Sequence, residues 1–135
     1  MDNNVNFTSY VRVNWNSIKK YMPEQADSIK TAVKNLRRNG DNNLIQLRAT
    51  KLQRVPDSDA FIKMTITENG KENSLNCHDL RKLGAIASHT DDSPYKIHKP
   101  DEKSLDEILA DIEKEKPDFG KIIQNSYEHH SKYSL

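Results

Sequence analysis

The clearest pattern in the chain is an alternation of apolar and polar residues between Ala60 and Cys77. From residue 60 to 67 the even positions are apolar and the odd positions are polar or aromatic, which is typical of a strand with one buried face. Asn69-Gly70 follows, and both residues tolerate the positive φ of a two-residue hairpin turn. That turn sets a register that pairs Glu68 with Lys71, Thr65 with Ser74, Met64 with Leu75, and Ile62 with Cys77. Because apolar pairs share one face and polar pairs the other, the pattern predicts a β-hairpin.

Two earlier stretches alternate in the same way. Residues 43–55 have apolar side chains at odd positions from 45 to 49, and residues 5–14 have them at most odd positions. Both stretches predict strands with one face toward a core. The polar face of the later strand would carry Arg48 and Arg54.

Apolar residues at helical spacing predict one helix over residues 24–38 and another over residues 78–88. The first would end at Asn39-Gly40, since glycine readily adopts the left-handed conformation that follows a helix. Lys34 and Arg37 flank its apolar stripe.

The C-terminal part reads as two short amphipathic helices. Ser104 and Glu107 form a capping box at the start of the first, and Asp118 can cap the second. The apolar stripes are Leu105, Ile108, Leu109 and Ile112 on the first helix, and Phe119, Ile122, Ile123 and Tyr127 on the second. From Asp101 to Asp118, eight acids and three lysines give a net charge of −5. These stripes need a surface on this chain, a second copy or another protein.

Together these elements predict an α+β fold. We expect a small mixed or antiparallel sheet of about four strands, with two helices on one face and a C-terminal acidic helical hairpin or tail. Residues 1–88 would form the core domain and residues 101–135 the tail. Residues 89–100 are polar, contain two prolines and have no periodicity, so we interpret them as a linker.

Composition limits how much of the chain a core can occupy. With 135 residues, 34% hydrophobic residues and a mean hydropathy of −0.91, the chain has room for one domain with a modest core. The net charge of +1 excludes a global polyelectrolyte, so any nucleic-acid interface must come from local charge.

The single cysteine, Cys77, cannot form an internal disulfide, which fits a reducing compartment. No N-terminal apolar run typical of a signal peptide is present, and no segment approaches the roughly 20 apolar residues of a membrane span. We therefore expect a cytoplasmic protein with no membrane partner.

Positive charge is concentrated between Lys30 and Arg54, where seven basic residues and one acid give a net of +6. If the strands form one sheet with helices on one side, the open face interleaves cations with aromatic rings, as single-strand-binding surfaces do. We predict a non-enzymatic nucleic-acid-binding accessory protein that prefers single strands. Its candidate contacts are Tyr10, Arg12, Lys34, Arg37, Arg48, Arg54, Phe61 and Lys63. The alternative is a solvated face whose aromatic rings cover neighbouring strands.

The C-terminal stripes support a second hypothesis. Their eight apolar residues would let a protein-interaction module, such as an inhibitor or adaptor, engage a partner protein or a second copy through residues 101–135. A helical hairpin packed on the chain's own sheet explains the same pattern.

Metal-binding and catalytic patterns are weak. Cys77, His78, His89 and His98 lack the paired spacing of zinc ligands, so we expect neither a metal nor a cofactor. His89 stands near Ser88, Asp91 and Asp92, but general acid–base catalysis needs such groups held in a pocket. No phosphate-loop, dinucleotide-binding, serine-hydrolase or metalloprotease motif is present, which argues only against those classes.

Overall fold

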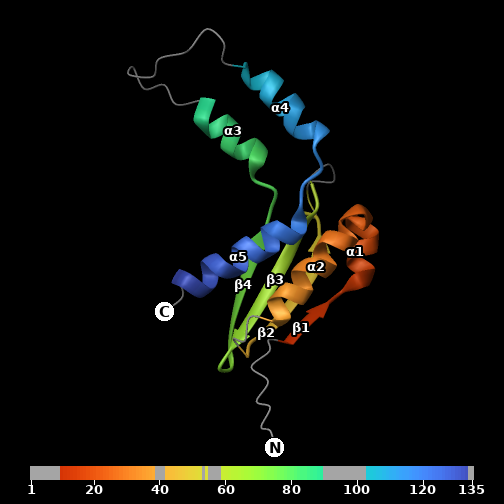
Figure 1. Cartoon of the computed structure of the whole chain (residues 1–135), viewed down its shortest axis with the longest axis vertical. Helices are drawn as coiled ribbons and strands as arrows, with labels where there is room; N and C mark the ends of the chain where they lie inside the picture. The colour runs from red at the N-terminus through yellow and green to blue at the C-terminus, as the bar shows by residue number, and fades with distance from the viewer. Residues whose placement is uncertain (1–9, 39–41, 53, 55–58, 90–102, 134–135) are drawn as a thin grey trace, which may run out of the picture. The chain divides into compact units, whose positions relative to one another are not determined.

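The computed structural model describes residues 10–38, 42–52, 54, 59–89 and 103–133 (Figure 1). The elements are β1 (Tyr10–Val13), α1 (Trp15–Tyr21), the 3₁₀ turn η1 (Pro23–Gln25), α2 (Ala26–Arg37), β2 (Leu44–Thr50), β3 (Phe61–Glu68), β4 (Lys71–Cys77), α3 (Arg81–His89), α4 (Leu105–Lys114) and α5 (Phe119–Tyr133). The α+β class is confirmed. Residues 5–9 of the first predicted strand, the Asn39-Gly40 helix stop and most of the predicted linker, residues 90–100, lie outside the described residues.

The strands form one mixed sheet in the order β1-β2-β3-β4. β1 runs parallel to β2, and the other two pairs are antiparallel. The predicted hairpin register is confirmed at all four residue pairs. Asn69 and Gly70 both adopt positive φ, 50° and 79°, as the two-residue turn requires.

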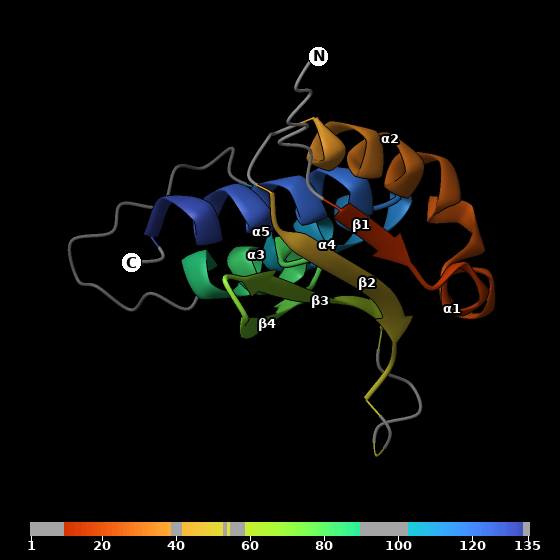
Figure 2. The same cartoon turned by 90° about the horizontal axis from the view of Figure 1, so that it is seen from below.

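Three helices cover one face of this sheet. Side chains of α1, α2 and α5 join those of all four strands in a single hydrophobic cluster, and Figure 2 shows α2 and α5 on the same side of the strands. Its fully buried members include Ile18, Ile29, Ile45, Ile62, Met64, Ile66 and Ile123. The apolar positions of the alternating strands point into this cluster, so their polar positions form the opposite face.

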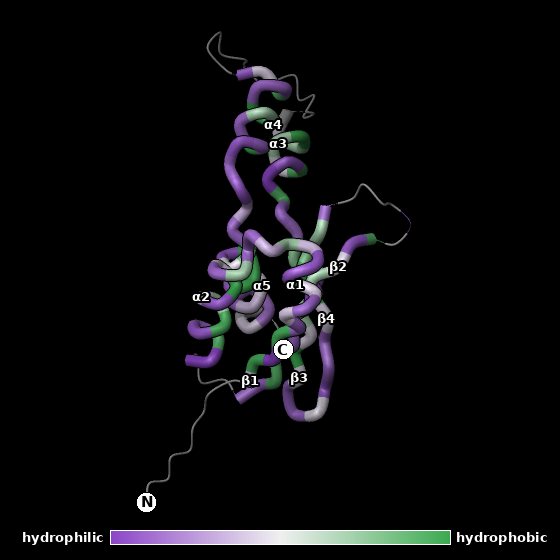
Figure 3. Tube along the Cα trace, turned by 90° about the vertical axis from the view of Figure 1, so that its right-hand side faces the viewer, coloured by the Kyte–Doolittle hydropathy of each residue, from purple (hydrophilic) through white to green (hydrophobic). Residues whose placement is uncertain are grey.

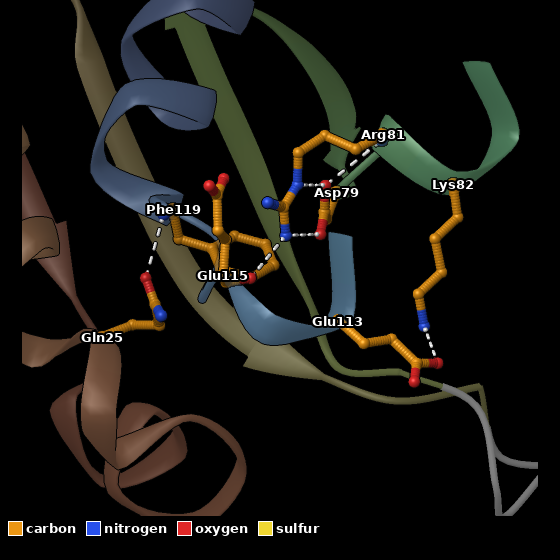
Figure 4. A network of polar contacts seen from close by, with 7 residues as sticks. All are labelled: Gln25, Asp79, Arg81, Lys82, Glu113, Glu115 and Phe119. Atoms are coloured by element: carbon orange, nitrogen blue, oxygen red, sulfur yellow. Dashed lines mark hydrogen bonds and ion pairs between the residues drawn. The ribbon is translucent and has the colours of Figure 1, made fainter. Parts of the chain in front are cut away.

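The start of α5 is attached to η1 and α2 by specific hydrogen bonds. The buried Gln25 side chain accepts a hydrogen bond from the Phe119 N–H at 3.0 Å (Figure 4). The Ser28 hydroxyl accepts another from the Gly120 N–H at 2.8 Å and donates to Asp118. Asp118 in turn accepts from the Lys121 N–H, as expected of a helix cap. These contacts satisfy backbone donors that a helix start leaves unpaired.

The position of α5 differs from the predicted division of the chain. Two compact units are present, residues 1–78 with 118–135, and residues 79–117. The second predicted stripe is therefore part of the core, because Phe119, Ile123 and Tyr127 are buried in the sheet cluster and Ile122 packs against it. Of the two helices expected on the sheet, α2 lies there, whereas α3 belongs to the second unit.

The second unit consists of α3 and α4. Asp79 forms a bidentate ion pair with Arg81 at 2.9 Å, and Arg81 also donates to the Glu115 carbonyl (Figure 4). Ser104 caps α4 by accepting from the Glu107 N–H, which confirms one half of the predicted capping box. Figure 3 shows apolar and hydrophilic positions interspersed along both helices. No helix in the described ranges is long and apolar enough to cross a membrane.

Candidate nucleic-acid interface

The polar side of all four strands forms the open face, which lies opposite α1, α2 and α5. Strand register arranges its side chains in rows across the sheet. The rows are Tyr10, Leu44, Thr67 and Glu72; then Arg12, Gln46, Thr65 and Ser74; then Arg48, Lys63 and Asn76; then Thr50 and Phe61. His78, the residue after β4, stacks on Phe61 at the end of the last row. The open face therefore carries cations, amides and hydroxyls from strands that are distant in the sequence.

A hollow of about 330 Å³ lies in the two middle rows. Its polar lining comes from Arg12, Asn14, Gln46, Arg48, Lys63 and Thr65. This volume is at the small end of the range for ligand sites, so it suits one compact group rather than a large molecule. Amides and cations are the side chains that donate hydrogen bonds to phosphate oxygens and base edges.

Two of the cations stand directly opposite each other. Arg48 on β2 pairs with Lys63 on β3, and Arg12 lies in the adjacent row. Directly opposed side chains in an antiparallel pair have Cβ atoms about 5 Å apart, and like charges at that separation are destabilising. Among the described residues none of these three cations has a carboxylate partner. A bound anion would relieve that repulsion.

The acidic residue of this face is far from the cations. Glu72 is the acidic residue among the described strand positions of the open face, and it pairs with Thr67 on β3. Asn76, which pairs with Lys63, is four residues from Glu72 along β4. Four residues of a strand span about 13 Å, so Glu72 is at least that far from Lys63 along the sheet. At that distance an exposed charge is largely screened at physiological salt. The positive potential of the hollow is therefore not neutralised within the face.

The structure separates the predicted contacts into two groups. Arg12, Arg48 and Lys63 meet around the hollow, and Tyr10 is 66% exposed at the end of the same face. Lys34 and Arg37 lie on α2, which covers the opposite face, and Arg37 donates to the Val11 carbonyl at 3.2 Å. Arg54 is exposed in the connection after β2 and does not line the hollow.

The prediction that Phe61 exposes its ring on the open face is wrong. Its strand position points to the open face, but it is only 5% exposed. The His78 ring covers it, with ring centroids 4.3 Å apart and planes inclined by 28°. Phe61 is therefore buried under His78.

In the described part of the chain, the candidate metal-binding and nucleophilic side chains do not come together as a site. No group of three or more His, Cys, Asp or Glu residues there is arranged to hold a metal ion. Cys77 is buried in the core, and that burial raises the pKa of its thiol despite a hydrogen bond with Ser126. A raised pKa disfavours the reactive thiolate. His98, Asp91 and Asp92 lie outside the described residues.

Sequence reasoning placed Gln46 and Thr65 on the polar sides of their strands, but it named neither of them, nor His78, as a candidate contact. The signal for His78 was present, because extending the hairpin register by one pair beyond Ile62 and Cys77 places it opposite Phe61. Gln46 and Thr65 required the pairing of β2 with β3, and no local pattern specifies that pairing.

Comparisons of the chain with protein-family models, with curated proteins and with solved structures found no match.

Proposed function

We propose that this chain is a non-enzymatic accessory protein that binds single-stranded nucleic acid on the open face of its sheet. The observation that carries the proposal is the group of Arg12, Arg48 and Lys63 around one hollow, with no carboxylate partner among the described residues. Phosphates are the anions that would relieve the repulsion between Arg48 and Lys63, and phosphate contacts dominate nucleic-acid affinity.

The preference for single strands follows from the rest of the face. Tyr10 exposes a ring on which a base can stack, and Gln46 and Thr65 offer hydrogen bonds beside the cations. Unpaired bases present both their ring faces and their edges, whereas a duplex presents neither freely to a sheet surface. The proposed phosphate contacts are reduced to the three cations of the hollow, because Lys34, Arg37 and Arg54 lie elsewhere.

The test is fluorescence anisotropy with labelled single- and double-stranded oligonucleotides at several salt concentrations. Three phosphate contacts with a single strand predict a slope of log K against log salt of about −2. The single strand should bind more tightly than the duplex. Binding without a salt dependence would contradict the proposal.

A pair of matched double variants tests the location. Arg48→Gln with Lys63→Gln removes two cations from the hollow and should reduce the slope by about 1.4. Lys19→Gln with Lys34→Gln removes the same charge from exposed positions on α1 and α2, and should leave the slope unchanged. Equal losses in both variants would mean that only net charge matters.

A second function is favoured by the surface of the other unit. Leu80 and Leu83 are 60% and 62% exposed, and Ile86 is 39% exposed. The stripe of α4, Leu105, Ile108, Leu109 and Ile112, is half-buried. In this alternative, residues 79–117 bind a partner protein or a second copy through these apolar side chains. The stripe residues of α5 are left out of it, because they belong to the core.

We place either activity in the cytoplasm. The single cysteine has no disulfide partner within the chain, and a reduced thiol is the normal state of cysteine in that compartment.

A further inference from the structure

Phe61 and His78 form a stacked pair at the end of the open face. The ring centroids are 4.3 Å apart and the ring planes are inclined by 28°. Phe61 is 5% exposed, whereas His78 is only half-buried, so the accessible ring surface of the pair belongs to His78. Among the described residues, the His78 ring has no hydrogen-bond or ion-pair partner. Its orientation is therefore set by stacking on a ring that is itself fixed in the sheet.

This pair lies next to the cations. Phe61 is two residues from Lys63 along β3, and His78 directly follows the last residue of β4, two residues after Asn76. Because the two rings stack, the pair lies beside the row of Arg48 and Lys63. Adjacent rows on one face of a sheet are about 7 Å apart. A nucleotide whose phosphate sits on Arg48 and Lys63 has its base within reach of that row.

We propose that His78, supported from beneath by Phe61, is the platform on which a base of the bound strand stacks. This inference rests on the function proposed above. It assigns the main stacking contact to His78 and not to Phe61, which the alternation of β3 indicated. Stacking on aromatic rings, histidine included, is how single-strand-binding surfaces hold bases. A ring that is already oriented loses little conformational freedom when the base arrives.

The experiment compares two strands of equal length, an oligothymidylate and an abasic oligonucleotide that keeps the sugar-phosphate backbone but has no bases. Both are titrated against the full chain by fluorescence anisotropy. His78→Leu removes the flat ring while still covering Phe61, and His78→Phe restores a flat ring. His129→Leu, at an exposed histidine of α5, is the matched control.

We expect His78→Leu to weaken oligothymidylate binding by about 5- to 150-fold, the range found for alanine substitution of stacked rings. Binding of the abasic strand should stay within about twofold, because its phosphate contacts are unchanged. His78→Phe should restore thymidylate affinity, and His129→Leu should change neither affinity. Thermal unfolding of each variant shows that the fold is intact.

Two negative results are distinguishable. If wild-type protein binds oligothymidylate and His78→Leu weakens both strands equally, or weakens neither, the stacking role of His78 is overturned while the proposed function stands. If wild-type protein binds neither strand, the proposed function fails and the platform fails with it.

Discussion

At the scale of single residues, Asp118 links two helices through its carboxylate. It accepts hydrogen bonds from the Ser28 hydroxyl and from the Lys121 N–H. These bonds, that from Ser28 first, hold the pKa of Asp118 below its ordinary value of 3.8. A carboxyl group whose pKa is lower in the folded state stabilises the fold above its ordinary pKa, and that contribution is lost as the pH falls through the lowered value.

Asp118→Asn should therefore make stability less dependent on pH. Asparagine keeps an oxygen that can accept the capping bond but lacks the negative charge, so near neutral pH the variant should lose the stabilisation that accompanies the lowered pKa of Asp118. Between about pH 5 and about pH 2, wild-type stability should fall more steeply than that of the variant. Thermal unfolding followed by circular dichroism across this range measures both slopes. Parallel curves would mean that Asp118 is not the titrating group.

On the open face, alternation predicts the direction of each side chain but not its exposure. Alternation alone puts Arg48 and Lys63 on the polar sides of their strands, and both are found there. The same alternation puts Phe61 outward and cannot detect that His78 covers it. The period of a strand states the direction of a side chain, but its exposure depends on the neighbouring strand.

At the scale of elements, α5 shows why an amphipathic stripe does not identify its own partner. The stripe of Phe119, Ile123 and Tyr127 is as consistent with an intermolecular contact as with an internal one. Its burial against α2 and the sheet is accompanied by the hydrogen bonds of Gln25 and Ser28 at the helix start. Those polar partners are about ninety residues away in the sequence, so no local motif joins them.

At Gly120, α5 lies in close contact with Ser28 of α2. A Cβ atom there would overlap the carbonyl oxygen and hydroxyl of Ser28, and backbone cannot move aside easily. Gly120→Ala should lower the free energy of unfolding by about 1–3 kcal/mol, the usual cost of overpacking. Urea unfolding measures the change.

Gly84→Ala in α3 is the matched control for that substitution. A Cβ atom at Gly84 meets nothing within 4 Å, so alanine should be neutral or should stabilise its helix by up to roughly 1 kcal/mol. A Gly120→Ala variant as stable as wild type would show that the two helices are not held at this distance.

At the scale of the whole molecule, the second unit is inserted between β4 and α5 of the first. Within residues 79–117, none of those that the structure describes (79–89 and 103–117) belongs to the hydrophobic cluster of the sheet unit. The sheet unit should therefore fold without the insertion. It should not fold without α5, which contributes Phe119, Ile123 and Tyr127 to that cluster.

Replacing residues 80–116 by a Gly/Ser linker of about twelve residues tests this organisation. The variant should keep the near-ultraviolet circular dichroism of a packed core and, under the leading proposal, its affinity for single strands. Truncation after residue 117 should abolish both. If the alternative function is correct, the linker variant loses partner binding or self-association, which light scattering and pull-down with the partner detect. A linker variant that unfolds would contradict the division into two units.

The sequence by itself determined the features that depend on neighbours in the chain. The hairpin register, the buried side of each strand and the caps of α4 and α5 follow from period-two alternation, from Asn69-Gly70, and from Ser104 and Asp118. These are short-range effects, because side-chain direction and helix capping are decided within a few residues.

Only the tertiary structure decided which surfaces met. It paired β1 with β2 in parallel, buried α5 on the sheet, and stacked His78 over Phe61. An apolar stripe indicates that apolar surface will be buried away from water. The hydrophobic effect is non-directional, so the stripe does not specify which surface covers it. The grouping of Arg12, Arg48 and Lys63 around one hollow is a consequence of that long-range pairing.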